Sequence, residues 1–185
     1  SSEKVFWRKA LDIYATSVDY SATAEESVLF FKTVQNKMLY AATGMTAAEL
    51  VSGRANALLP MMGMTVAKGK RPTLAEAKTA KNYLNEEELG TLNRLVSAYL
   101  DLAELQAMRK KPMYMKDWVA RLDDYLRMTD SEVLQNAGKV SHALAEQKAK
   151  EEYQKYKRLH SGELSRVEQA FLESVEATAK RLEGK

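Results

Sequence analysis

Four Thr-x-x-Glu sequences recur along the chain, and each stands before apolar residues spaced three or four positions apart. In such a capping box, the Thr and Glu side chains satisfy each other's backbone N–H groups at the start of a helix. The alternation of apolar and polar residues that indicates a strand never extends beyond a few positions. The boxes begin at Thr23, Thr46, Thr73 and Thr129, and Asn85 with Glu88 forms a looser version. The pattern therefore predicts an all-α chain.

The apolar spacing predicts helices over residues 3–18, 24–42, 46–53, 73–83, 85–109, 116–127 and 129–135, and a helical region over 141–185. This region carries one narrow apolar stripe on a highly charged surface, and Ser161–Gly162 could bend or break it. Such a stripe is typical of a helix that docks along another helix. We expect an irregular multi-helix bundle with one long ordered loop. Residues 1–140 would form the core domain, and the long C-terminal helical region 141–185 would pack on that core or on a second subunit.

Two apolar surfaces predict a homo-oligomer. The first helix is apolar around nearly half of its circumference, which suggests burial against two neighbours. The apolar stripe within residues 141–185 is narrower, and we expect it too to be buried against a neighbour. The expected interface residues are Phe6, Trp7, Tyr14, Leu164, Val167, Phe171 and Val175.

The longest non-helical segment covers residues 53–72. Three glycines and two prolines forbid a continuous helix there, yet the middle of the segment is too apolar for a solvated linker. We expect it to pack on something, with Met61, Met62 and Met64 as core plugs or as a partner groove. Loops of this length inside compact domains are often functional.

Basic residues at the end of this loop form one candidate site for phosphate or nucleic acid. They would act together with a second basic run before Pro112, although the glycine spacing is not that of a P-loop. A solvated basic rim is the alternative interpretation. The candidate residues are Lys68, Lys70, Arg71, Arg109, Lys110 and Lys111.

Composition excludes several classes of function. The 185 residues contain no Cys, so disulfides, thiolate metal sites and cysteine nucleophiles are excluded. No apolar stretch is long enough for a membrane span, and the chain does not open on a signal peptide, so we expect a cytoplasmic protein. A net charge of +3 does not by itself indicate a nucleic-acid partner. The chain opens without Met, and we expect it to be a domain of a longer protein.

A metal-dependent reaction would need convergent carboxylates or histidines. Asp101, Glu104 and Asp117, with Asp123 and Asp124 nearby in sequence, could hold Mg²⁺ if their helices converge. Neighbouring Arg and Lys residues favour solvated ion pairs instead. The two histidines, His142 and His160, lack metal-ligand spacing. The sequence predicts no metal site and no cofactor.

Six ordered segments resemble one known family, the virulence RhuM proteins, in their C-terminal portion. The resemblance covers about residues 1–158. The segments are FFKTVQNKM at 30–38, TAAE at 46–49, AKNYL at 80–84, LNRLV at 92–96, LAELQA at 102–107 and PMYMKDW at 112–118.

The resemblance implies an association with DNA or with the mobile-element and defence systems of bacteria, in which this half would assemble or regulate the protein. Family members usually carry a segment similar to a helix-turn-helix before this region, and some relatives are joined to Fic/Doc domains. The family often has His within the segment that reads YAATGM here, at 40–45, and Asp where this chain has Asn56.

The leading hypothesis is therefore a non-enzymatic helical assembly or regulatory domain of a RhuM-like protein. Such a domain would form homo-oligomers and reach nucleic acid through the helix-turn-helix-like half, with no membrane partner. A nuclease-like metal-dependent enzyme that uses the clustered carboxylates and a DNA-binding module remain as alternatives.

Overall fold

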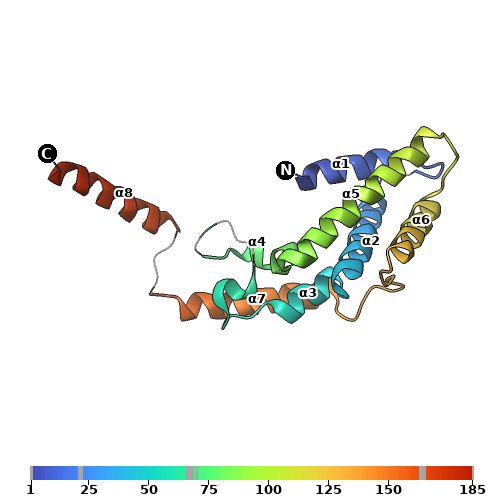
Figure 1. The fold of residues 1–185 in the computed structure, drawn as a ribbon. Helices are drawn as coiled ribbons and strands as arrows, with labels where there is room; N and C mark the ends of the chain where they lie inside the picture. Colours follow the sequence, from blue (N-terminus) through green and yellow to red (C-terminus); the bar gives the residue numbers. More distant parts are fainter. Residues whose placement is uncertain (1, 21–22, 66–68, 70, 163–165, 185) are drawn as a thin grey trace. The chain divides into compact units, whose positions relative to one another are not determined.

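The computed structural model is built from helices (Figure 1). It describes residues 2–20, 23–65, 69, 71–162 and 166–184, with side chains described from Arg8 onward except those of Ala24 and Arg166. Within these residues there is no strand, so the all-α prediction is confirmed. The elements are α1 (Ser2–Ala15), α2 (Ala24–Thr43), α3 (Ala47–Arg54), the 3-10 helix η1 (Pro60–Gly63), α4 (Leu74–Ala77), the 3-10 helix η2 (Ala80–Tyr83), α5 (Glu86–Met108), α6 (Met115–Met128), α7 (His142–Leu159) and α8 (Arg166–Glu183).

Two predicted helices are wrong in detail. The segment 73–83 is not one helix, because α4 ends at Ala77 and η2 follows after a turn. The segment 129–135 contains no helix. Thr129 instead closes the preceding helix, since its Oγ1 donates to the Leu126 carbonyl at 2.7 Å and Asp130 takes a left-handed φ of 59°. Such a residue directly after Thr129 prevents a helical first turn.

The chain divides into two compact units, each built from two stretches. Unit 1 comprises residues 1–49 and 84–141, and unit 2 comprises residues 50–83 and 142–185. The loop 53–72 therefore belongs entirely to unit 2.

Unit 1 is a four-helix arrangement. Helix α2 packs against α5 and α6, and α1 packs against α2 and α5. Tyr99 and Tyr125 sit at the centre and donate through their hydroxyls to the carbonyls of Trp118 and Leu95. The core consists of Ile13, Tyr14, Phe30, Val34, Met38, Leu95, Tyr99, Leu100, Ala103, Met113, Trp118, Leu122, Tyr125 and Leu126.

A buried lysine ties three parts of unit 1 together. Lys37 on α2 is 8% exposed, and its Nζ donates to the Leu134 carbonyl at 2.7 Å. The same Nζ lies 2.9 Å from Asp123 Oδ1 on α6. A buried ammonium needs both a counter-charge and a hydrogen-bond acceptor. Asp123 and the Leu134 carbonyl supply them to Lys37, and these contacts hold the irregular segment after α6 against α2.

In unit 2, α4 and η1 pack against α7. Met62 is fully buried and Met64 is 7% exposed, as expected of core plugs, while Met61 is only partly buried. Arg54 Nη1 donates to the Tyr83 carbonyl at 2.9 Å, and the Tyr83 hydroxyl donates to the Ala77 carbonyl at 2.6 Å. The loop is thus an ordered, packed part of unit 2 in the residues that the structure describes.

Candidate functional site: the Asn56 groove beside α7

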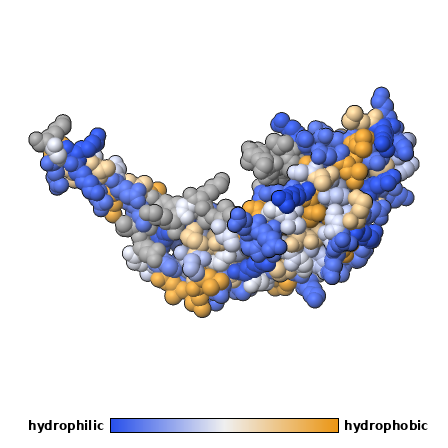
Figure 2. Space-filling view, in the orientation of Figure 1, coloured by the Kyte–Doolittle hydropathy of each residue, from blue (hydrophilic) through white to orange (hydrophobic). Residues whose placement is uncertain are grey.

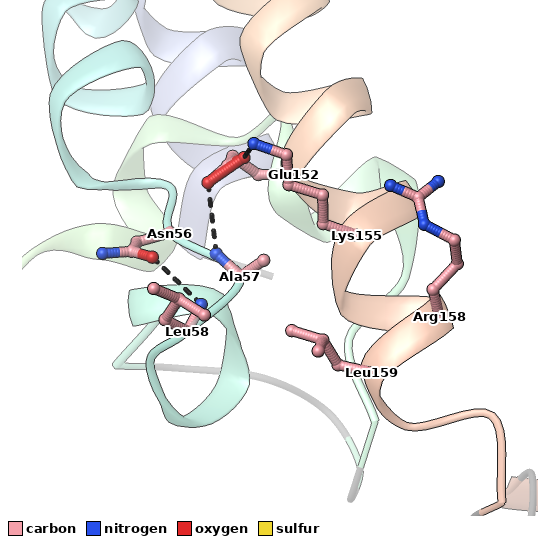
Figure 3. A pocket seen from close by; sticks show the side chains of 7 residues that line it. All are labelled: Asn56, Ala57, Leu58, Glu152, Lys155, Arg158 and Leu159. Carbon is pink, nitrogen blue, oxygen red and sulfur yellow. Dashed lines mark hydrogen bonds and ion pairs between the residues drawn. The ribbon is translucent and has the colours of Figure 1, made fainter.

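Asn56 organises the turn that follows α3. Its Oδ1 accepts a hydrogen bond from the Leu58 N–H at 3.0 Å, as shown in Figure 3. Its own N–H donates to the Met62 carbonyl at 3.0 Å, and its carbonyl accepts from the Leu59 N–H at 3.1 Å. The side-chain acceptor is one that Asp also supplies. Asn at this position therefore forms the same turn that an Asp would form.

Three successive residues in this turn have left-handed backbone angles. Met61, Met62 and Gly63 have φ values of 52°, 60° and 85°. Each non-glycine residue in this region costs roughly 1–2 kcal/mol, which the full burial of Met62 offsets. A Cβ at Gly63 would lie 2.5 Å from the Arg54 carbonyl oxygen, so only glycine fits there. Backbone strain of this kind clusters at functional segments.

The turn exposes two leucines, whereas it buries Met62. Leu58 is 82% exposed and Leu59 is 46% exposed. Figure 2 shows apolar surface at the bottom of the view, over the turn after α3. Exposed leucines beside a rigid turn form a surface that a partner could cover.

Helix α7 supplies the opposite wall of a groove of about 330 Å³, which we call the Asn56 groove (Figure 3). Leu159 faces the groove from the end of α7 and is 60% exposed. The lining consists of Asn56, Ala57, Leu58, Glu152, Lys155, Arg158 and Leu159.

Glu152 joins the two walls of the groove. Its Oε1 accepts from the Ala57 N–H at 3.4 Å, and its Oε2 lies 3.2 Å from Lys155 Nζ. Burial opposes ionisation of this carboxyl, but the Lys155 ammonium and the Ala57 N–H outweigh it, so the pKa of Glu152 lies below its ordinary value. The carboxylate is charged at neutral pH and holds the turn to α7.

The groove places apolar side chains beside positive charge. Among its seven described lining residues there is no His, Cys, Ser or Thr to serve as a nucleophile. Leu58 and Leu159 provide apolar contact, while Lys155 and Arg158 place positive charge at the edge. Arg158 forms no ion pair among the described residues. This combination fits an apolar side chain with an acidic group beside it.

The structure assigns the candidate carboxylates separate local tasks. Glu104 pairs with Lys9 at 3.3 Å, and Asp117 accepts from the Tyr114 N–H at 2.8 Å at the start of α6. Asp101 is exposed on α5. Asp123 pairs with Lys37, and Asp124 with Arg127. Within the described residues, no three acidic or histidine side chains gather closely enough to hold a metal ion.

The two histidines likewise lie apart. His142 is exposed and its Nε2 lies 3.3 Å from Glu146 Oε1 at the start of α7. His160 stacks on Tyr156 with ring centroids 4.0 Å apart.

The candidate phosphate-contacting residues fall into different units. Lys68 and Lys70 lie outside the described residues. Arg71, in unit 2, donates from Nη2 to the His160 carbonyl at 2.8 Å. Arg109, Lys110 and Lys111 are exposed after α5 in unit 1.

The expected interface residues have different surroundings. The side chains of Phe6 and Trp7, and all of Leu164, lie outside the described residues. Tyr14 is 2% exposed and packs on Tyr20 and Phe30 inside unit 1, so its ring is not available to a partner.

The interface residues that the sequence predicts on α8 are exposed in the single chain, so a partner could cover them. Val167, Phe171 and Val175 are 80%, 67% and 48% exposed. Sequence reasoning singled out the loop but missed Lys155, Arg158 and Leu159, because nothing in the spacing of α7 shows that the turn packs on it.

No helix of the described residues is apolar and long enough to cross a lipid bilayer. No curated protein and no solved structure gives a significant match to the chain. The model of the virulence protein RhuM family, however, matches residues 1–164 of the 185. This match spans unit 1, the Asn56 groove and α7, and the chain belongs to the virulence protein RhuM family.

Proposed function

We propose that this chain is a non-enzymatic assembly domain that brings copies of a RhuM family protein together. The observation that carries the proposal is an exposed apolar face on α8, the α8 ridge. Its members recur at helical spacing, and each is at least 41% exposed. They are Val167, Phe171, Leu172, Val175 and Leu182.

An exposed face of this size on a charged helix needs a partner. Full burial of an aliphatic or aromatic side chain contributes roughly 1.5–3 kcal/mol, so the five members of the ridge contribute at most roughly 7.5–15 kcal/mol. Association costs about 4–15 kcal/mol in lost freedom of motion. A single ridge is therefore marginal, and an assembly in which two ridges are buried at once is favoured.

The family gives this assembly a context. The resemblance to RhuM proteins associates the chain with DNA, and with mobile-element or defence systems in the bacterial cytoplasm. We assign DNA contact to the helix-turn-helix-like segment that relatives usually carry before this region. An assembly domain would then set the number and spacing of those segments. The Lys37, Glu104, Asp117 and Asp124 contacts give no support to a metal-dependent enzyme.

The test is the molar mass of the 185-residue chain by light scattering after size-exclusion chromatography, over a range of concentrations. We expect a mass above that of one chain, and Phe171→Asp should shift it towards the monomer. Ala177→Asp is the matched control, because Ala177 is exposed on the far side of α8 and receives the same new charge. A wild-type chain that is monomeric at every concentration would refute the assembly function.

A further inference from the structure

Positive charge gathers on the segment between α5 and α6, which we call the basic loop (residues 109–116). Its cations are exposed, and none of them forms an ion pair among the described residues. They are Arg109, Lys110, Lys111 and Lys116. Cations this close together repel one another unless an anion lies between them. The basic loop therefore favours a negatively charged partner.

The core of unit 1 holds the basic loop in place. Met113 is 6% exposed, and its carbonyl accepts a hydrogen bond from the Val18 N–H at 2.8 Å. The carboxylates of Asp19 and Asp117 each accept a backbone N–H at the start of α6, at 2.9 and 2.8 Å. In the part of the chain that is described, neither carboxylate forms an ion pair with the loop. A loop held in this way loses little further freedom when it binds a partner.

Lys110 has a left-handed backbone, with a φ of 54°, directly after the end of α5. Its N–H donates to the Ala107 carbonyl at 3.1 Å and so closes the last turn of the helix. Glycine is the usual residue at such a position, because it lacks the Cβ that makes this conformation unfavourable. Lysine here therefore lowers stability, and no ion pair of the described residues offsets the strain. Strain of this kind clusters at functional segments.

An exposed aromatic ring stands among these cations. Tyr114 is 46% exposed, and it pairs with no other ring of the described residues. Lys116 Nζ lies 5.8 Å from the centre of the Tyr114 ring. Met108, just before the loop, is 77% exposed. Unpaired nucleobases stack on such rings while their phosphates meet the cations. A duplex hides the faces of its bases, so it offers the phosphates alone.

We propose that the basic loop binds single-stranded nucleic acid, with its cations on successive phosphates and one base stacked on Tyr114. The site lies in unit 1 and is separate from the α8 ridge, so the inference goes beyond the proposed assembly function. A lipid surface or an acidic peptide would also meet the cations, but neither brings a succession of flat rings to Tyr114. The ring therefore distinguishes the partner.

Fluorescence anisotropy of a labelled oligothymidylate of about 15 nucleotides, titrated with the whole chain at low salt, tests the proposal. We expect it to bind at least about fivefold more tightly than a duplex of the same length, because stacking adds to the phosphate contacts. Tyr114→Leu should remove this preference, whereas Tyr114→Phe, which keeps the ring, should stay within about twofold of wild type. Four phosphate contacts on a single strand predict a salt slope near −3, at about −0.7 for each.

Lys110→Gly separates binding from folding. This variant should unfold at a higher urea concentration than wild type, because glycine removes the backbone strain. It should nevertheless bind the oligothymidylate more weakly, with a salt slope reduced by about 0.7. Arg94→Gln is the control, since it removes an exposed cation of α5 about 22 Å along the helix from Arg109 and should leave binding unchanged.

Three results would overturn the inference. Tyr114→Leu with wild-type affinity would show that no base stacks on the ring. Polyglutamate that competes as well as the oligothymidylate would show that charge alone is recognised. Displacement of the oligothymidylate by phosphatidylglycerol vesicles would reassign the loop to a lipid surface. The Phe171→Asp variant should keep the preference for single strands, so a failure of the assembly function leaves this inference standing.

Discussion

Gly63 is a residue of unit 2 at which the backbone does not tolerate a side chain. Its φ of 85° and the 2.5 Å approach of a Cβ to the Arg54 carbonyl mean that Gly63→Ala meets both strain and a backbone clash. We expect a loss of about 1–3 kcal/mol in the free energy of unfolding, measured by urea denaturation. Gly53→Ala is the control, since a Cβ there meets no atom within 4 Å. Equal stability of the two variants would contradict this account of the turn.

Lys37 tests how a buried charge holds unit 1 together. Lys37→Met leaves Asp123 partly buried without its cation, and the Leu134 carbonyl loses its donor. We expect a loss of roughly 3–5 kcal/mol, whereas Lys9→Met, which breaks the exposed pair with Glu104, should cost no more than about 1 kcal/mol.

Chemical denaturation followed by circular dichroism measures both variants. A double variant, Lys37→Met with Asp123→Leu, should recover part of the loss because no uncompensated charge remains. No recovery would show that the lysine acts through packing alone.

Glu152 gives unit 2 a predictable dependence on pH. Because the folded pKa lies below the ordinary value, its contribution is fully present above the unfolded pKa, roughly 4.3. The contribution is lost as the pH falls through the folded pKa. Glu152→Gln retains an acceptor for the Ala57 N–H but no charge, and should lower stability at pH 7 by about 1–2 kcal/mol.

In thermal unfolding experiments, the difference in stability between wild type and Glu152→Gln should therefore shrink as the pH is lowered into the acid range. Glu151→Gln, at an exposed neighbour on α7 that accepts a hydrogen bond from Gln147, should show a much smaller difference at neutral pH. A difference for Glu152→Gln that is constant with pH would remove the ion pair as its cause.

At the scale of the element, local caps made the starts of α3, α4 and α5 predictable, whereas the Thr23 side chain makes no capping hydrogen bond at the start of α2. The boxes at Thr73 and Asn85 form with both reciprocal hydrogen bonds, and Thr46 with Glu49 does the same. Gly44 takes the left-handed conformation expected at the end of α2. These signals depend on residues close in sequence, so a sequence pattern contains them.

Two local caps and one contact between distant residues were not predicted. The box at Thr129 has the right spacing but forms no helix, because its hydroxyl bonds back to α6. The start of α6 uses the Asp117 carboxylate to accept from the Tyr114 N–H, a cap without Ser or Thr. The Asn56 groove needs the pairing of Glu152 with Ala57, which are 95 positions apart. The loop was predictable as a packed segment, but its partner was not.

The cap of α5 provides a prediction for a single element. Asn85→Ala removes the acceptor of the Glu88 N–H at 2.8 Å and should lower the free energy of unfolding by about 1 kcal/mol. Asn93→Ala changes the same residue type at an exposed position inside α5, where Ala has the higher helix propensity. It should be neutral or slightly stabilising in the same urea experiment. If both variants lose the same stability, the cap is not the cause.

At the scale of the whole molecule, the chain forms two units that are interleaved in the sequence. Each unit combines an early and a late stretch of the chain, and the division falls inside α3. Local periodicity shows which face of a helix is apolar but does not show which distant helix covers it. The same limit applies between molecules, because the exposed apolar residues of α8 do not show which surface would cover them.

The distribution of positive charge argues that this chain alone binds DNA weakly. The net charge is +3, and the exposed basic run of Arg109, Lys110 and Lys111 lies in unit 1, whereas Lys68, Lys70 and Arg71 belong to unit 2. The logarithm of the binding constant falls with the logarithm of salt by about 0.9 for each phosphate neutralised. A run of three cations therefore predicts a slope near −3 for one copy and near −5 for a dimer, compared with up to roughly −9 for proteins that make ten phosphate contacts.

Fluorescence anisotropy of a labelled duplex, titrated at several salt concentrations, measures this slope. We expect weak binding that disappears near physiological salt and is reduced further when Arg109, Lys110 and Lys111 are replaced by Gln. Because dimerisation doubles the number of basic runs on one duplex, the Phe171→Asp monomer should bind more weakly than wild type. Tight binding with a slope steeper than about −6 would instead place DNA recognition within this chain. Assembly through α8 would then serve that recognition directly.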